Sequence, residues 1–196
     1  MAFPEVERAR KEGGCLMNAV VVYESHWGNT AAVARAIAEG LGPEVRALTT
    51  DEATAAALSD ADLIVAGAPV IAFRLASDKM RAGLVNDSGK APTPPDLSHP
   101  SMRSWLKDLP WGHGRSAAFE TRVWWSPRGA TGDIERGLQG AGYPPCAKAG
   151  RFVVTGTYGP LKEGELDRAR QWGAELAASM NAENESRPAD RELVRT

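Results

Sequence analysis

The 196-residue sequence has little of what marks secreted, zinc-binding or membrane-spanning proteins. Its two cysteines, Cys15 and Cys146, are too few for a disulfide framework, and no Cys-x-x-Cys pair is present to bind zinc. These thiols fit a reducing, cytoplasmic compartment best. No apolar run reaches the roughly 20 residues that a membrane span needs, and the opening segment lacks the hydrophobic stretch of a signal peptide. We therefore expect neither a membrane-spanning segment nor a signal peptide.

An excess of either charge is also missing. The chain carries 23 Lys and Arg against 25 Asp and Glu, a net charge of −2. This balance argues against a basic nucleic-acid surface and against a strongly acidic tail. The phosphate-binding pattern GxxxxGK[ST] and the nucleophile pattern GxSxG are both absent, and the three histidines show no metal-ligand spacing. We expect no metal site.

The sequence does contain a regular alternation of strand-like and helix-like segments. The expected strands are Ala19–Tyr23, Glu44–Leu48, Asp62–Ala66, Ser116–Phe119 with its neighbours, and Arg151–Gly156. The expected helices are Thr30–Leu41, Asp51–Leu58, Ser101–Leu109, Thr131–Gly140 and Glu163–Met180. This alternation predicts an α/β fold, a doubly wound five-stranded parallel sheet with helices on both faces. Such sheets bind ligands at the carboxyl ends of their strands.

The two ends of the chain differ from this central domain, residues 17–180. Residues 1–16 are polar, and we expect a flexible arm. Lys11-Glu12-Gly13 can be encoded by codons that resemble a bacterial ribosome-binding site, which makes Met17 a candidate natural start. The mainly polar segment Asn181–Thr196 is expected to be a disordered tail.

The loop after the first strand has the chemistry of a phosphate site. Ser25 and Thr30 offer hydroxyl groups, Asn29 offers an amide, and Gly28 lets the backbone approach a ligand closely. The next helix points its free N–H groups and positive dipole end at this loop. A turn in which Thr30 or Asn29 merely caps the helix is the alternative. The two remaining loop residues, His26 and Trp27, are also candidate ligand-binding residues. We expect His26 to face solvent rather than act as a catalytic group, and Trp27 to cover the loop.

These residues resemble the flavodoxin family, whose loop runs Ser/Thr-x-Thr-Gly-Asn-Thr. Ser25, Gly28, Asn29 and Thr30 match that pattern, and Trp27 departs from it because it replaces a hydroxyl residue. The resemblance covers about residues 18–180. It is strongest to small actinobacterial flavodoxin-domain proteins, which share Tyr-Glu-Ser before the loop and sequences like 119–122 (Phe-Glu-Thr-Arg) and 159–165 (Gly-Pro-Leu-Lys-Glu-Gly-Glu).

The resemblance implies that the first-strand loop wraps the phosphate of FMN and that two later loops hold the flavin ring. The loop after the third strand supplies Ala68, Pro69, Val70 and Ile71, where the two apolar residues replace the family's usual polar pair. The loop after the fourth strand supplies the last two candidates, Thr121 and Trp124. Core or surface packing of both loops is the alternative. Glu120 and Arg122 are expected to pair with neighbours.

The function implied by the resemblance is that of an FMN-binding redox protein. It would pass electrons to a partner protein or reduce a small quinone-like acceptor. The alternative is a flavodoxin-like interaction module that binds FMN weakly or not at all. Residues 74–110 form a long insertion, which could cover the flavin edge or make a homodimer contact; we favour a mobile surface loop. We expect His99 and His113 to face solvent.

Overall fold

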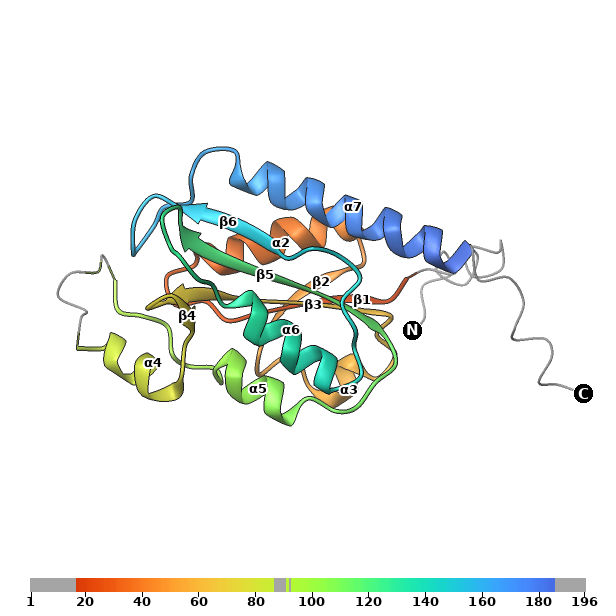
Figure 1. Cartoon of the computed structure of the whole chain (residues 1–196), viewed down its shortest axis with the longest axis horizontal. Helices are drawn as coiled ribbons and strands as arrows, with labels where there is room; N and C mark the ends of the chain where they lie inside the picture. Colours follow the sequence, from red (N-terminus) through yellow and green to blue (C-terminus); the bar gives the residue numbers. More distant parts are fainter. Residues whose placement is uncertain (1–16, 87–90, 92, 186–196) are drawn as a thin grey trace, which may run out of the picture.

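The computed structural model describes residues 17–86, 91 and 93–185. Within them a central sheet lies between two layers of helices (Figure 1). Five strands pair in parallel in the order β2-β1-β3-β5-β6. They are β1 (Ala19–Tyr23), β2 (Arg46–Thr49), β3 (Leu63–Ile71), β5 (Arg115–Val123) and β6 (Gly150–Val154). The predicted doubly wound fold is confirmed. Because the chain runs from β1 outward to β2 and then back across to β3, the switch point lies between β1 and β3.

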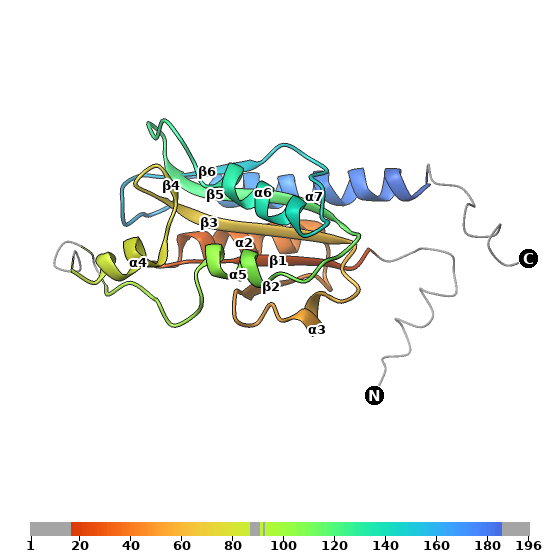
Figure 2. The same ribbon diagram turned by 60° about the horizontal axis from the view of Figure 1, so that its bottom comes forward.

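The two helical layers explain why the central strands are apolar on both faces. Val20 and Ile64 pack with α3 (Ala55–Leu58), α5 (Met102–Asp108) and α6 (Thr131–Gly140). Val21 and Val65, one position later, pack with α2 (Asn29–Leu41) and α7 (Glu165–Glu185) on the opposite face. Figure 2 shows these two layers on either side of the strands. Alternate side chains of one strand therefore enter different cores.

Helices α2 and α7 pack at very short range. A Cβ atom added to Gly40 would lie 1.9 Å from the carbonyl oxygen of Arg170, and one added to Gly173 would lie 2.3 Å from that of Ile37. The missing side chains let the two backbones approach. This contact holds α2, whose first turn forms part of the candidate site, against the longest helix of the described chain.

Several element boundaries differ from those predicted. The strand expected to end at Ala66 continues to Ile71, and the one expected around Ser116–Phe119 continues to Val123. Parallel pairing up to Pro69 and Thr121 extends both strands beyond their most apolar stretch. Helix α3 begins only at Ala55, because Thr54 accepts a hydrogen bond from the N–H of Ala57 and caps it. The expected start of this helix at Asp51 was wrong.

The insertion 74–110 is mostly ordered where the structure describes it, which contradicts our preferred interpretation of a mobile loop. It contains β4 (Arg74–Leu75), α4 (Asp78–Leu84) and α5. Met102 and Trp105 are buried in the core, and the indole of Trp105 donates a hydrogen bond to the carbonyl of Ala53.

At the other end, α7 continues through Asn181–Glu185, so the first residues of the expected tail are helical. The rest of that tail and the expected arm 1–16 lie outside the described residues. None of the described helices is long and apolar enough to cross a membrane.

Candidate functional site

A cavity of about 330 Å³ lies at the carboxyl ends of the strands, where the predicted loops meet. Nine of the twelve predicted site residues line it: Ser25, His26, Trp27, Asn29, Thr30, Pro69, Val70, Ile71 and Thr121. Lining residues that the prediction did not include are Ala72, Phe73, Leu84, Arg122, Val123, Trp125, Ser126, Val154, Thr157 and Tyr158. The last three come from β6 and the loop after it, and no sequence pattern in that loop distinguished it as a site.

The N-terminus of α2 faces this cavity without a side-chain cap. Its N-cap residue is Gly28, whose φ of +87° is the left-handed conformation that glycine adopts readily. The described residues provide no hydrogen-bond acceptor for the N–H groups of Asn29, Thr30 and Ala31, and the first helical bond runs from Ala32 to Gly28. Neither Asn29 nor Thr30 acts as the cap. Free N–H groups at the positive end of a helix dipole form a site for an anion.

The two threonines of the site bind each other. The hydroxyl oxygens of Thr30 and Thr121 lie 2.8 Å apart, and both residues are buried. Since one hydroxyl donates and the other accepts, this bond ties the start of α2 to the end of β5. The Ser25 hydroxyl in turn accepts a hydrogen bond from the N–H of Gly28 at 3.2 Å and shapes the turn that precedes α2.

Trp27 is packed between two other loops, in the covering position we predicted. Its indole N–H donates to the carbonyl of Thr93 at 3.1 Å, and its ring meets Tyr158 edge-to-face with centroids 5.0 Å apart. The residue that replaces the family's hydroxyl group therefore closes one side of the cavity with an aromatic wall.

A further part of the cavity lining is a β-hairpin that the sequence did not reveal. Val70 and Ile71 pair with β4, and the turn between the strands consists of Ala72 and Phe73. Both turn residues have positive φ, 45° and 65°, which is costly for side chains other than glycine. Residues 68–71, which we expected in a loop after the third strand, therefore belong to β3 itself, and that expectation was wrong.

Three predicted residues do not line the cavity. Ala68 is fully buried in the core below it, and Gly28 acts only through the backbone of the helix start. Trp124 is 78% exposed and does not line the cavity, whereas its neighbour Trp125 lines it and contacts Phe73 edge-to-face. The tandem tryptophans are evident in the sequence, but which of the two lines the cavity depends on the backbone where β5 ends.

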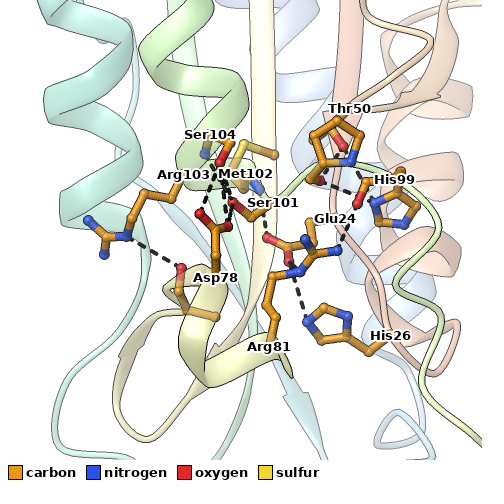
Figure 3. A network of polar contacts seen from close by, with 12 residues as sticks. Glu24, His26, Thr50, Asp78, Arg81, His99, Ser101, Met102, Arg103 and Ser104 are labelled. Carbon is orange, nitrogen blue, oxygen red and sulfur yellow. Dashed lines mark hydrogen bonds and ion pairs between the residues drawn. The ribbon is translucent and has the colours of Figure 1, made fainter. Parts of the chain in front are cut away.

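A buried carboxylate, Glu24, organises the region behind the cavity (Figure 3). Glu24 directly follows β1 and is fully buried. Its Oε1 pairs with Nε of Arg81 at 2.7 Å, and its Oε2 accepts a hydrogen bond from the N–H of Met102 at 2.8 Å. Arg81 also donates to the carbonyl of His99 at 2.8 Å. Burial raises the pKa of Glu24, and the Met102 N–H and Arg81 oppose that shift.

His26 and His99 are buried, so the expectation that both face solvent was wrong. The backbones of His26 and Asp96 are hydrogen-bonded, and Nδ1 of His26 lies 3.1 Å from the carbonyl oxygen of Asp96. Because a carbonyl only accepts, we assign the ring proton to Nδ1. Nε2 then carries no proton, so this nitrogen and Oε1 of Glu24, which lie 3.4 Å apart, are both acceptors. Burial lowers the pKa of His26 to about 4, so its ring is neutral at pH 7.

This network joins parts of the chain that are far apart in sequence. Glu24 holds α4 through Arg81 and the start of α5 through Met102, while Thr50 donates to the carbonyl of Pro100 at 2.6 Å. These contacts hold the segment before α5 next to the loop that follows β1. A charged residue directly after a fully apolar strand was the available sequence signal for Glu24, but its partner Arg81 carried none.

Glu120 and Arg122 pair as expected, at 2.9 Å. Glu120 has a second role: its Oε2 accepts hydrogen bonds from the N–H groups of Ala130 and Thr131 and caps α6. His113 is exposed, as expected. Within the ranges that the structure describes, no group of three or more His, Cys, Asp or Glu side chains is arranged to hold a metal.

No protein-family model and no curated protein matches the chain, whereas solved structures do. An archaeal flavodoxin matches with a TM-score of 0.57 and 20% identity, over 84% of this chain and 99% of that one. The chain has the flavodoxin-like fold. Oxidised flavodoxin 1 of Bacillus cereus matches with a TM-score of 0.56 and 17% identity, over 82% and 97%. The flavodiiron protein of Giardia intestinalis matches with 0.54 and 19%, over 93% of this chain but 41% of that one.

The residues at the cavity fit a flavin mononucleotide. The uncapped start of α2 suits a doubly charged phosphate, and the apolar and aromatic walls suit a planar ring. Val70, Ile71 and Trp125 form those walls. The Thr30 hydroxyl can donate to a phosphate only when Thr121 donates the hydrogen bond between the two threonines. The helix N–H groups and the Asn29 amide are the donors that do not depend on this orientation.

Proposed function

We propose that this chain binds FMN at the cavity and functions as a flavodoxin-type redox protein. The uncapped N-terminus of α2, with three unpaired N–H groups facing a cavity of suitable chemistry, is the observation that carries this proposal. The backbone of residues 29–31 would hold the phosphate, and Trp27, Tyr158, Val70 and Trp125 would enclose the ring. When bound, FMN supplies the electron-transfer chemistry. The protein orients the flavin and limits its access to water.

The expected electron acceptor is a partner protein or a small quinone-like molecule. Similar structures include flavodoxins and proteins with flavodiiron cores, and this range is compatible with either acceptor. We expect the reducing equivalents to arrive from a partner or from a reductant that binds over the flavin.

The substitution Asn29→Asp tests the phosphate site without disturbing the fold. The two side chains have the same shape, and a carboxylate in the first turn favours the helix dipole, so we expect unchanged or slightly higher stability. The same charge opposes a phosphate at the N–H groups. We expect FMN affinity to fall at least about tenfold, measured by quenching of FMN fluorescence. Asn181→Asp, an exposed position on α7, makes the same charge change away from the site and serves as control.

An interaction module without flavin is the alternative function. It is favoured by one observation: Thr30 and Trp27, two residues of the phosphate loop, are already engaged by Thr121 and Thr93. A purified chain that remains colourless after growth with FMN and does not quench added FMN would refute our proposal and favour this alternative. Near-stoichiometric FMN in the visible spectrum would support our proposal.

A further inference from the structure

Three large aromatic side chains are exposed in two neighbouring turns beside the cavity. Phe73 is 41%, Trp124 78% and Trp125 57% exposed. Phe73 lies in the turn between β3 and β4, and the two tryptophans follow β5. The contact between Phe73 and Trp125, with centroids 5.7 Å apart, makes the two turns one surface. Exposed aromatic groups that gather in this way mark binding surfaces.

The charged residues in these turns have one sign. Residues 69–77 and 121–132 contain Arg74, Arg122 and Arg128 but no lysine, aspartate or glutamate. Arg122 is neutralised by the buried carboxylate of Glu120. Arg74 and Arg128 are exposed and have no ion-pair partner among the residues that the structure describes. The two turns therefore carry a net positive charge, although the whole chain has a net charge of −2.

We define the arginine–aromatic rim as Phe73, Arg74, Trp124, Trp125 and Arg128. Its composition is that of a protein interface, where tryptophan, phenylalanine and arginine are enriched and lysine, glutamate and aspartate are depleted. Trp124 and Arg128 lie outside the cavity lining, so a small acceptor inside the cavity would leave them uncovered. Only a larger partner would cover the whole rim.

We propose that the arginine–aromatic rim docks a partner protein through an acidic face with an apolar centre. This inference rests on the proposed function, because docking here would place the partner at the mouth of the flavin cavity. The two arginines would steer an acidic partner toward the rim, and the tryptophans would supply the apolar contact once water is excluded. The rim would select against basic partners by like-charge repulsion.

A second copy of this chain is not the occupant that the rim favours. In a two-fold dimer the same patch meets itself. Arg74 and Arg128 would then face the arginines of the other copy, and the rim contains no carboxylate to pair with them. Such a contact would bury like charges together.

The test measures association of the full chain with two probe proteins of similar size, an acidic [2Fe–2S] ferredoxin and a basic c-type cytochrome. Biolayer interferometry gives the affinities with and without bound FMN, at low salt and near physiological ionic strength. We expect binding of the acidic probe only, with affinity falling as salt rises. We expect Arg74→Gln/Arg128→Gln to weaken binding at low salt and Trp124→Ala to weaken it about tenfold at both. Arg46→Gln, an exposed arginine on β2, serves as control.

Equal or stronger binding of the basic probe would overturn the proposal, as would acidic-probe binding that ignores the rim substitutions. Concentration-dependent dimers in sedimentation velocity that Trp124→Ala abolishes would assign the rim to a second copy instead. Because association is measured without flavin as well, a rim that binds the acidic probe in a chain that never binds FMN would refute only the proposed function.

Discussion

The buried ion pair between Glu24 and Arg81 allows a quantitative prediction. Substitution Arg81→Met leaves the carboxylate of Glu24 fully buried, without the guanidinium that lies 2.7 Å away. Removing one partner of a buried pair costs about 3–5 kcal/mol, because the other charge is left uncompensated. We expect a loss of that size in the free energy of unfolding at neutral pH, measured by urea denaturation. Arg136→Met, which breaks a largely exposed pair on α6, should cost far less.

The pH dependence of this loss identifies its cause. Burial already raises the pKa of Glu24 above its ordinary value of 4.5, and removing Arg81 takes away an opposing influence. The folded state then holds a proton that the unfolded state releases, so stability falls as pH rises from 4.5 toward the folded pKa. We expect Arg81→Met to cost less near pH 5 than near pH 7.5.

A double substitution separates charge from packing. Glu24→Gln keeps an oxygen that can accept the Met102 N–H but removes the charge. In the Arg81→Met background it should recover at least about half of the lost stability. A loss below about 1 kcal/mol, a loss independent of pH, or no recovery in the double variant would each refute the reasoning.

Three further predictions concern the site and its supports. Thr30→Val or Thr121→Val alone should cost about 1–3 kcal/mol in thermal unfolding, because a buried hydroxyl loses its partner; the double variant should be nearly as stable as the parent. Gly129→Ala should destabilise the chain by about 2 kcal/mol or more, because its Cβ would lie 2.1 Å from a buried carboxylate oxygen, whereas Gly83→Ala, with no atom within 4 Å, should be neutral or stabilising. In an NMR titration His26 should stay neutral until about pH 4. Its pKa in the unfolded chain is 6.5, so the unfolded chain takes up a proton first, and the free energy of unfolding should fall by up to about 3 kcal/mol as pH falls from 6.5 to 4. A midpoint near 6.5 would contradict its burial.

The layered α/β fold could be predicted because its signals are local. The apolar run Ala19–Tyr23 is buried in β1 on both faces, and the helical spacing in Thr30–Leu41 matches α2 to within one residue. Most boundary errors occurred where tertiary contacts extend an element. Pairing of β3 with β5 extends both strands past their apolar stretches. Helix α7, which packs against α2, likewise extends beyond the end of its apolar pattern.

The candidate site was predicted where one loop contains the whole pattern and missed where distant segments meet. Ser25–Thr30 could be recognised because a strand, a glycine and a helix start follow one another in sequence. Tyr158 could not, because its contact with Trp27 spans more than a hundred residues. The insertion 74–110 was misjudged for the same reason, because the ion pair between Arg81 and Glu24 that anchors α4 produces no periodic pattern in the sequence.

By itself the sequence determined the order of the five parallel strands along the chain, the doubly wound sheet and the loop that precedes α2. Each of these depends on spacing along the chain, which local hydrophobicity and glycine placement specify. Only the tertiary structure decided that the hydroxyl groups of Thr30 and Thr121 hydrogen-bond each other, that Trp125 rather than Trp124 lines the cavity, and that His26 is buried. These outcomes depend on which side chains meet across the sheet, and that proximity exists only once the chain has folded.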